Sequence, residues 1–377
     1  MRHKPVRTPR WRTALIAPAA ALALSLAGCQ HKELCLLPEE HLTDNTVSFT
    51  FDYEQAWHEA YPLTADSALS WLADWPEDLL GRSYDELRPD RPEGVRIRYR
   101  TPGGKTSFIN LDPDGGRTRW SDEEYQLLLH NNDTEYILFE DDALLGTVTA
   151  TTRTRTRATY LGNSLTNSGS ETEKTVNPPD MLYSAYIESF RITPLAGAQQ
   201  RLDVMLQPAV FSYIVRFSVE KNYKAVVLAR GALAGMAREV NLIDRSTTAQ
   251  TATLLFDAEV GEDCIVAVVR SFGIPSYTPG SKQTDSNGSG LSSKQSVANV
   301  PRYGLNLEVM LANGQMLSFD FDVTDQVSAQ PNGGVVMVSG IEIPDEALVG
   351  GGGGGGFSAS VSDWGPYQDV IMDITYN

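Results

Sequence analysis

The sequence predicts an all-β protein built from antiparallel β-sandwich domains, and three observations support this fold class. Apolar and polar residues alternate with a period of two along most of the chain. Short segments rich in glycine, proline, asparagine and aspartate separate the alternating runs, as turns between strands do. Helical periodicity is scarce, and only residues 66–75 and 233–238 suggest short helices.

The first half of the chain contains two clear examples of this alternation. Val47, Phe49 and Phe51 alternate with polar residues in the first, and three arginines separate the apolar residues of the second. A strand with one apolar and one polar face is expected where an antiparallel sheet covers a core on one side. We therefore predict strands over residues 47–53 and 95–100.

The second half contains further strands, some of them apolar on both faces. Residues 225–229 and 265–269 are continuous apolar runs, which suit deeply buried strands. Residues 305–311 and 317–323 alternate, and Asn313-Gly314 lies between them. Because Asn-Gly is favoured in tight two-residue turns, these two runs predict a hairpin.

A change in composition divides the chain into two domains. Residues 153–180 begin with alternating arginine and threonine, continue with asparagine, serine and glycine, and end in Asn177-Pro178-Pro179-Asp180. This segment lacks the apolar residues of a core, so we predict a linker here. The prediction places an N-terminal sandwich at residues 45–152 and a C-terminal sandwich at residues 181–377.

The N-terminus predicts a lipoprotein signal peptide over residues 1–28. Five basic residues precede a short apolar run, which ends in Leu26-Ala27-Gly28-Cys29. The run is shorter than the ~20 residues that a membrane-spanning helix needs. We therefore expect cleavage before Cys29, acylation of its thiol, for example with palmitate, and a lipidated tether over residues 29–44. A plain signal peptide with an incidental cysteine is the alternative.

The net charge restricts the partners of the chain. The chain has 377 residues and a formal net charge of −17, and removal of the basic leader makes it more acidic still. Such a surface repels nucleic acid and anionic lipid headgroups, so the acyl chains must hold the protein at the membrane. Gln30 follows the cysteine, and this residue favours the outer membrane. We expect a lipid-anchored protein of the outer membrane, exposed at the cell surface.

A set of short segments resembles a known family. The segments, in order along the chain, are residues 31–35, 125–129, 131–137, 235–237, 311–315, 321–327 and 361–364. Together they are similar to the fimbrillin-associated lipoproteins of Bacteroidetes, which are close to the type V pilus anchor and minor-fimbrillin proteins. The similarity extends over nearly the whole mature chain, and residues 54–92 depart from the family pattern.

The resemblance implies a fold and a function. It implies two Greek-key, transthyretin-like β-sandwich domains in tandem, an outer-membrane lipid anchor and no enzyme activity. It also implies an accessory, anchor or tip role in a type V-like fimbria (pilus) and in cell adhesion. The expected partners are other fimbrial subunits, joined by strand exchange, and no cofactor is expected.

Two segments are candidates for a role in such assembly. Arg153, Arg155 and Arg157 lie in the predicted linker and suit a trypsin-like protease, although a solvated linker without a specific role is an alternative. A run of glycines that includes Gly350 and Gly356 would permit hinge motion around Gly353. The segment beyond it, residues 357–377, would then pair with the sheet edge of a neighbouring molecule. A surface loop that closes a hairpin within the chain is the alternative.

Four tryptophans support a second hypothesis of a different class. Their side chains would stack against sugar rings, which predicts a glycan-binding lipoprotein, although core packing is the alternative for each of them. The four candidates are Trp57, Trp71, Trp75 and Trp120.

Motifs for metal binding and catalysis are missing from the sequence. Asp320, Asp322 and Asp325 do not form the clustered loop that calcium requires, and we expect no metal site. The chain has no Gly-x-Ser-x-Gly or His-Glu-x-x-His motif. We therefore expect no catalytic residues and a non-enzymatic protein.

Overall fold

The computed structural model describes most of the two predicted domains. It describes residues 45–53, 91–121, 123–140, 145–158, 160, 173–193, 199–262, 264–278 and 303–349, and the backbone of residues 368 and 369. The predicted leader, the tether, the glycine run and the suggested helix at residues 66–75 lie outside the described residues. None of the helices within the described ranges is long and apolar enough to cross a membrane.

The described chain is all-β, as the alternation predicts. The strands of its first half are β1 (Thr46–Asp52), β2 (Val95–Arg100), β3 (Thr106–Leu111), β4 (Gly115–Arg119), β5 (Glu124–Asn131), β6 (Ile137–Glu140), β7 (Thr149–Thr152), β8 (Arg155–Thr156), β9 (Lys174–Val176) and β10 (Tyr183–Arg191). Those of the second half are β11 (Gln200–Met205), β12 (Gln207–Pro208), β13 (Phe211–Lys221), β14 (Val226–Ala237), β15 (Val240–Asn241), β16 (Thr251–Val260), β17 (Cys264–Ser271), β18 (Gly304–Leu311), β19 (Met316–Asp322), β20 (Gly334–Glu342) and β21 (Gln368–Asp369). Short helices are η2 (Tyr223–Ala225), α4 (Thr324–Ser328) and α5 (Asp345–Val349).

Two sheets form the N-terminal sandwich. One has the strand order β11-β1-β4, and the other has the order β12-β10-β5-β2-β3. Phe49 of β1 packs against Trp120 and Phe190, with ring centroids 6.1 and 6.4 Å apart. Gly115 begins β4 at φ +115°, and a Cβ atom there would lie 2.0 Å from the carbonyl oxygen of Phe49. Only glycine allows this close approach of β4 to β1.

The C-terminal sandwich is a larger, eight-stranded system. Its strands follow the order β19-β18-β14-β16-β17-β13-β20, and β9 also pairs with β16. β18 and β19 form the predicted hairpin, with Gly314 at φ +83° and its amide bonded to the carbonyl of Leu311 at 2.8 Å. Inside, Tyr213 is fully buried and its hydroxyl donates to the carbonyl of Gln330 at 2.8 Å.

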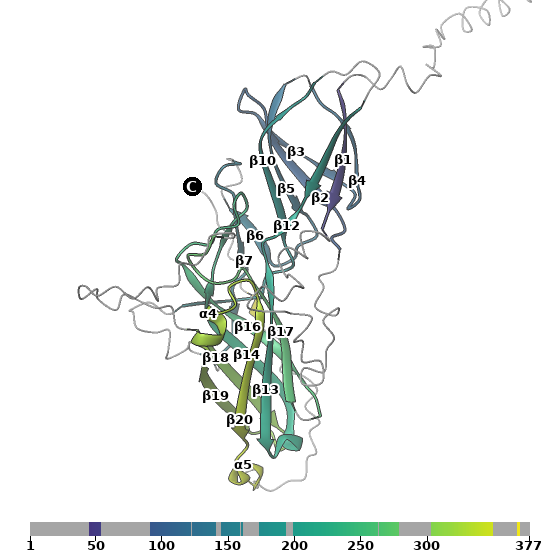
Figure 1. Ribbon diagram of the computed structural model, residues 1–377. Helices are drawn as coiled ribbons and strands as arrows, with labels where there is room; N and C mark the ends of the chain where they lie inside the picture. Colours follow the sequence, from purple (N-terminus) through teal and green to yellow (C-terminus); the bar gives the residue numbers. More distant parts are fainter. Residues whose placement is uncertain are drawn as a thin grey trace, which may run out of the picture.

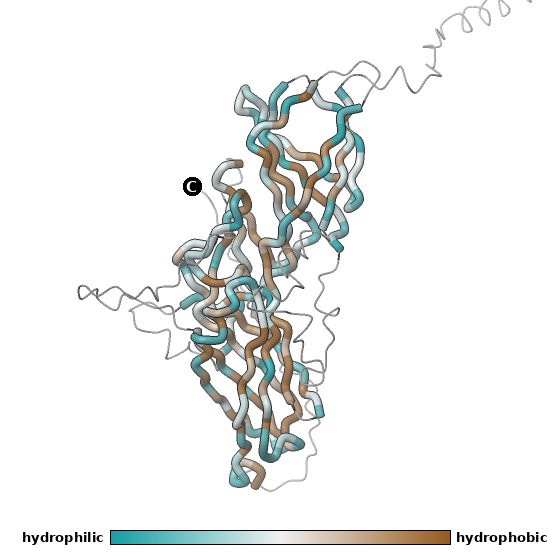
Figure 2. The backbone as a smooth tube through the Cα atoms, in the orientation of Figure 1, coloured by the Kyte–Doolittle hydropathy of each residue, from teal (hydrophilic) through white to brown (hydrophobic). Residues whose placement is uncertain are grey.

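The two sandwiches lie end to end, with a small sheet between them (Figure 1). This sheet has the order β15-β7-β6, and its buried Ala150 and Val240 belong to the core of the N-terminal sandwich. Hydrophobic residues concentrate along the strands of both sandwiches, while hydrophilic residues predominate in many of the loops at their ends (Figure 2). The apolar alternation read from the sequence therefore corresponds to two cores that are stacked along one axis.

Strand pairing divides the chain differently from its composition. β10, β11 and β12 follow the predicted linker, yet they pair with β5 and β1 in the N-terminal sandwich. The N-terminal sandwich thus continues to about residue 208, and the expected boundary at residues 180–181 does not describe the strand pairing. The physical reason is that the positions beside β1 and β5 are filled by strands from a later part of the chain.

Three further observations differ from the sequence analysis. Residues 233–237, suggested as a helix, belong to β14, because both of its neighbours pair with it. The pairs β1–β11, β13–β20 and β9–β16 are parallel rather than antiparallel. Parallel neighbours need a long crossover, and more than a hundred residues separate β1 from β11 and β13 from β20.

Candidate functional site: a buried arginine cluster

The segment after β7 lies across the outer face of the C-terminal sheet. In an extended chain, alternate side chains point to the same side, so Arg153, Arg155 and Arg157 share one face of this segment. The backbone is held at both sides: the amide of Arg153 donates to the carbonyl of Tyr136 at 3.0 Å, and the amide of Asn177 donates to the carbonyl of Arg153 at 2.9 Å. The side chains of Arg155 and Arg157 point onto the sheet, where they contact the carbonyl of Leu255 and the side chain of Asn306.

Arg155 is anchored at the β16 side of this face. Its Nη1 donates to the carbonyl of Leu255 at 2.9 Å, and its Nη2 contacts Oδ2 of Asp257 at 3.1 Å. The side chain of Asp257 is 57 % exposed, so this ion pair is partly solvated. The contact fixes the position of Arg155 more than it stabilises the fold.

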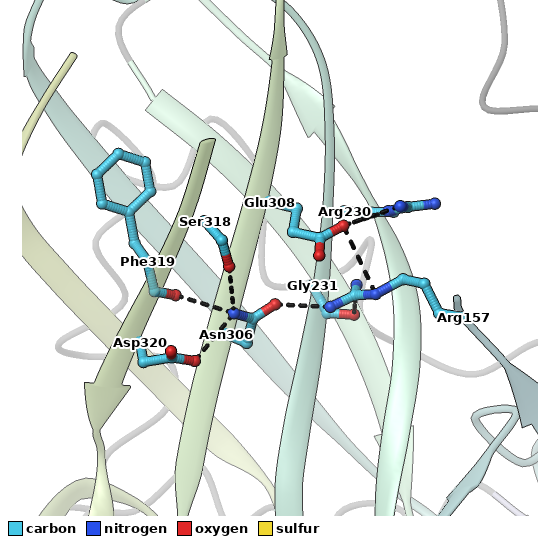
Figure 3. Close-up of polar contacts among 8 residues, drawn as sticks. All are labelled: Arg157, Arg230, Gly231, Asn306, Glu308, Ser318, Phe319 and Asp320. Carbon is cyan, nitrogen blue, oxygen red and sulfur yellow. Dashed lines mark hydrogen bonds and ion pairs between the residues drawn. The ribbon is translucent and has the colours of Figure 1, made fainter. Parts of the chain in front are cut away.

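Arg157 is the centre of a buried set of polar groups, the buried arginine cluster, which comprises Arg157, Arg230, Asn306 and Glu308. Its Nη2 donates to Oδ1 of Asn306 at 2.6 Å, and its Nε lies 3.7 Å from Oε2 of Glu308 (Figure 3). The same carboxylate oxygen accepts a hydrogen bond from Nε of Arg230 at 2.9 Å. Glu308 therefore lies between two guanidinium groups, and the side chains of Arg157 and Glu308 are only 2 % and 4 % exposed.

Asn306 extends the cluster to the edge strand β19. Its Nδ2 donates to Oγ of Ser318 at 2.9 Å and to Oδ1 of Asp320 at 2.9 Å (Figure 3). The ring of Tyr160 lies under the guanidinium group of Arg157, 4.8 Å from its central carbon. Burial raises the pKa of the Tyr160 hydroxyl to about 12, so the phenol stays neutral at physiological pH.

The arrangement is suited to holding a segment in place. Two arginines share the carboxylate of Glu308 in a buried layer, where an unpaired charge would be costly. The described part of the chain holds no group of three or more His, Cys, Asp or Glu side chains that could bind a metal ion. We infer from this geometry that the segment at Arg155 and Arg157 is fixed to the C-terminal sandwich through charged side chains.

The candidate residues from the sequence fall into three groups. Arg155 and Arg157 are buried and Arg153 is half-buried, so the expectation of a solvated linker does not describe them. Trp120 is 7 % exposed and packs in the N-terminal core against Tyr99 and Tyr125, so its ring cannot stack on a sugar from outside. The remaining candidates, Cys29, Trp57, Trp71, Trp75, Gly350, Gly353 and Gly356, lie outside the described residues.

Sequence reasoning missed the other members of the cluster. Asn306 and Glu308 alternate with Leu305, Leu307 and Val309, a pattern that normally marks a solvated strand face. Arg230 offered a signal, because it interrupts an otherwise apolar stretch. A charge at such a position is expected to be paired if the strand is buried on both faces.

The C-terminal segment also returns to this region. Gln368 and Asp369 of β21 pair antiparallel with Thr156 and Arg155 of β8. The described part of the segment beyond the glycine run thus pairs with the same strand that carries Arg155. β8 has the short strand β9 nearby, and Thr154 forms a bridge with Val176.

A second buried group lies in the N-terminal sandwich. His130 of β5 is buried, its ring lies 4.5 Å from that of Phe139, and its Nδ1 contacts the carbonyl of Asn131 at 2.7 Å. Burial, with a smaller contribution from the nearby charges of Arg98 and Arg96, lowers the pKa of His130 to about 4. The imidazole is therefore neutral at pH 7.

Comparisons with known proteins give one family model and several solved structures. The family model is described as a domain of unknown function (DUF5119), and it matches residues 84–257. This range begins before β2 and ends inside β16, so it includes strands of both sandwiches together with Arg155, Arg157 and Arg230. No curated protein matches the chain.

The structural neighbours are Bacteroidetes adhesin candidates and Porphyromonas fimbrial proteins, the kind of protein that the sequence resemblance names. A candidate adhesin from Bacteroides ovatus is 18 % identical, with a TM-score of 0.48, over 81 % of this chain and 96 % of that chain. The fimbrial anchor protein Mfa2 from Porphyromonas gingivalis is 12 % identical, with a TM-score of 0.35, over 78 % and 90 %. The tip fimbrial protein Mfa3 from the same organism is 8 % identical, with a TM-score of 0.28, over 62 % and 77 %.

Proposed function

We propose that this chain is a non-enzymatic, lipid-anchored protein of the cell surface and an accessory, anchor or tip component of a type V-like fimbria. The observation that carries the proposal is the predicted leader over residues 1–28 with Cys29 directly after it, followed by a chain that folds into two β-sandwiches. Two or more acyl chains at Cys29 hold a soluble domain on a membrane firmly. The family resemblance of the ordered sequence segments supports the fimbrial role.

The proposed mechanism of assembly is strand exchange. The segment beyond the glycine run leaves its own chain and adds to the sheet edge of a neighbouring subunit, where backbone hydrogen bonds supply affinity. In the monomer, Gln368 and Asp369, the described residues of this segment, pair with β8, and exchange would replace this pairing by one with a neighbouring subunit. Release of the segment would leave Arg155 in place, because its side chain is anchored on β16.

Cross-linking on intact cells tests the proposal. We expect the wild-type chain to be recovered in the outer-membrane fraction and cross-linked to fimbrial subunits. Replacement of Cys29 by Ser removes the acylated thiol, so the protein should leave the membrane fraction and lose its palmitate label. Circular dichroism of the Cys29→Ser protein is the control. A spectrum like that of the wild type would show that the variant is folded, so that its loss from the membrane fraction comes from the missing anchor.

The partners identified by cross-linking decide between the two functional hypotheses. Fimbrial subunits would support the proposed function. A transporter of the outer membrane, together with binding on a glycan array, would favour the alternative of a glycan-binding lipoprotein. That alternative now depends on Trp57, Trp71 and Trp75, because Trp120 is part of the core.

A further inference from the structure

β3 is an edge strand that lacks the features by which edge strands usually avoid pairing. It ends the order of its sheet and pairs with β2 in a continuous register, without a bulge. Its sequence, Thr-Ser-Phe-Ile-Asn-Leu, contains neither a charged residue nor a proline. Charges, prolines, bulges and short length are the protections found on natural edge strands. β3 has six residues and none of these protections.

The other described edge strands of the two sandwiches differ from β3 in this respect. β4 carries two arginines, β11 carries Arg201 and Asp203, and β19 carries two aspartates. β20 has shifts in its register with β13, and β12 has only two residues, one of them a proline. Among the described edge strands of five residues or more, β3 alone has neither a charge nor a bulge.

Within the described part of the chain, β3 is also open to solvent. Four of its six residues are exposed, and Phe108 is 55 % exposed. Ile109 and Leu111, which point toward the core, are only partly buried. A further strand at this edge would therefore bury apolar side chains as well as pair with the backbone groups that face away from β2.

An arginine ladder accompanies this edge. Arg96, Arg98 and Arg100 lie on the outer face of β2, about 6.8 Å apart along the strand. The guanidinium group of Arg96 reaches over β3: its central carbon lies 4.5 Å from the ring centroid of Phe108, and its Nε donates to Oδ1 of Asn110 at 3.0 Å. The guanidinium group of Arg96 thereby lies over the edge strand β3. A strand added beside β3 would lie about one strand spacing from this positive charge.

We propose that β3 is a docking edge for an extended segment of a partner protein that carries carboxylates on alternate residues. Backbone pairing with β3 supplies the affinity, and the arginine ladder on the same face selects acidic side chains. The spacing of alternate side chains in a partner strand equals the spacing of the arginines. Because the chain as a whole has a net charge of −17, an acidic segment is repelled elsewhere and directed to this face. This inference rests on the proposed function, since it names an edge that a subunit of an assembly would use.

Two synthetic peptides test the docking edge with the full chain. One alternates aspartate and valine, and the other alternates lysine and valine. We expect the acidic peptide to bind at least about tenfold more tightly at low ionic strength, and its binding to weaken as salt is added. Hydrogen exchange should show slower exchange of amides in residues 106–111 when the acidic peptide is bound.

Matched substitutions distinguish the edge from the rest of the surface. Phe108→Glu places a negative charge on β3 and should abolish the protection, and Arg96→Glu should reduce affinity for the acidic peptide about tenfold or more. Met316→Glu, the same kind of change on the edge strand β19, and Arg117→Glu, a charge reversal on β4, should leave binding unchanged. Circular dichroism of each variant confirms that it is folded before its affinity is compared.

Three results would overturn the proposal. The first is equal binding of the two peptides by the wild-type chain. The second is binding without protection of residues 106–111. The third is binding of an oligogalacturonate at the arginine ladder that displaces the acidic peptide and leaves the β3 amides unprotected, because this would assign the face to an anionic glycan. Failure here would leave the fimbrial proposal intact, since that proposal is tested by the partners cross-linked on cells.

Discussion

At the scale of residues, the most informative side chain is Glu308. It is buried between Arg157 and Arg230, and it joins a segment of residues 155–160 to the middle of the C-terminal sheet. Removal of one partner from a buried ion pair leaves an uncompensated charge, which typically costs about 3–5 kcal/mol. The carboxylate is therefore important because it has two cationic neighbours and almost no water.

We predict that Glu308→Gln lowers the free energy of unfolding by about 3 kcal/mol or more, because both arginines lose their counter-charge. Urea denaturation followed by circular dichroism measures the change. Asp257→Asn is the matched control, since Asp257 is the exposed partner of Arg155, and it should change stability by less than about 1 kcal/mol. Equal effects of the two substitutions would show that burial does not decide the strength of these pairs.

His130 predicts a dependence of stability on pH. Its pKa is about 4 in the folded chain and about 6.5 when unfolded, so the unfolded state binds a proton first as the pH falls. Stability should therefore decrease between about pH 6.5 and pH 4, by about 1.4 kcal/mol for each unit of the shift, and change no further through this group below pH 4.

The contribution of His130 is isolated by His130→Gln. This variant cannot titrate in the same range, so the slope of its unfolding free energy against pH should be smaller than that of the wild type between pH 6.5 and 4. Urea titrations at several pH values measure both slopes. Equal slopes for the wild type and the variant would show that carboxylates, and not His130, cause the loss of stability at low pH.

At the scale of elements, the segment β8 illustrates how a linker-like sequence becomes a fixed part of a domain. Its composition is polar, and nothing in its local pattern indicates burial. The side chains of Arg155 and Arg157 nevertheless contact Leu255, Gly231 and Asn306, which lie on three neighbouring strands. Long polar side chains can anchor a segment in this way when the sheet beneath offers carbonyl and amide oxygens.

Limited trypsin digestion tests the state of β8. We predict that the folded chain is not cut after Arg155 or Arg157, because a protease needs an exposed and extended backbone. Lys105, in the exposed turn between β2 and β3, is the internal control for active trypsin. Early fragments that end at Arg155 or Arg157 would instead show that the segment opens and would support the protease-sensitive linker read from the sequence.

At the scale of the whole molecule, the two sandwiches are interleaved in sequence. The chain forms most of the N-terminal sandwich, crosses to the C-terminal sandwich at β8 and β9, and then returns to supply β10, β11 and β12. β10 lies inside its sheet, between β12 and β5, so the N-terminal sandwich is incomplete without it. Many of the strand pairs join residues that lie far apart in the sequence, and a high contact order of this kind generally slows folding.

A pair of fragments tests this organisation. We predict that a fragment ending at residue 152 fails to unfold cooperatively, because it lacks the strands that complete both of its sheets. A fragment ending at residue 210 contains those strands and should show a cooperative urea transition. Circular dichroism and one-dimensional NMR measure both. Cooperative unfolding of the shorter fragment would restore the boundary predicted from composition.

The sequence by itself determined the local features of this protein. The alternation of residues 47–53 and 95–100, the hairpin at Asn313-Gly314 and the all-β class follow from a period of two and from turn chemistry, which act over a few residues. The predicted leader over residues 1–28, with Cys29 directly after it, is likewise a local pattern, and the expected lipidation comes from it.

Only the tertiary structure decided which strands become neighbours. The partner of β1 is β11, about 150 residues later in the chain, and no local pattern specifies such a pairing. The burial of Arg157 and Glu308 was decided in the same way, because each looks like a solvated residue until a distant segment covers it. Strand periodicity fixes which face a side chain occupies, whereas packing between remote segments decides whether that face meets water.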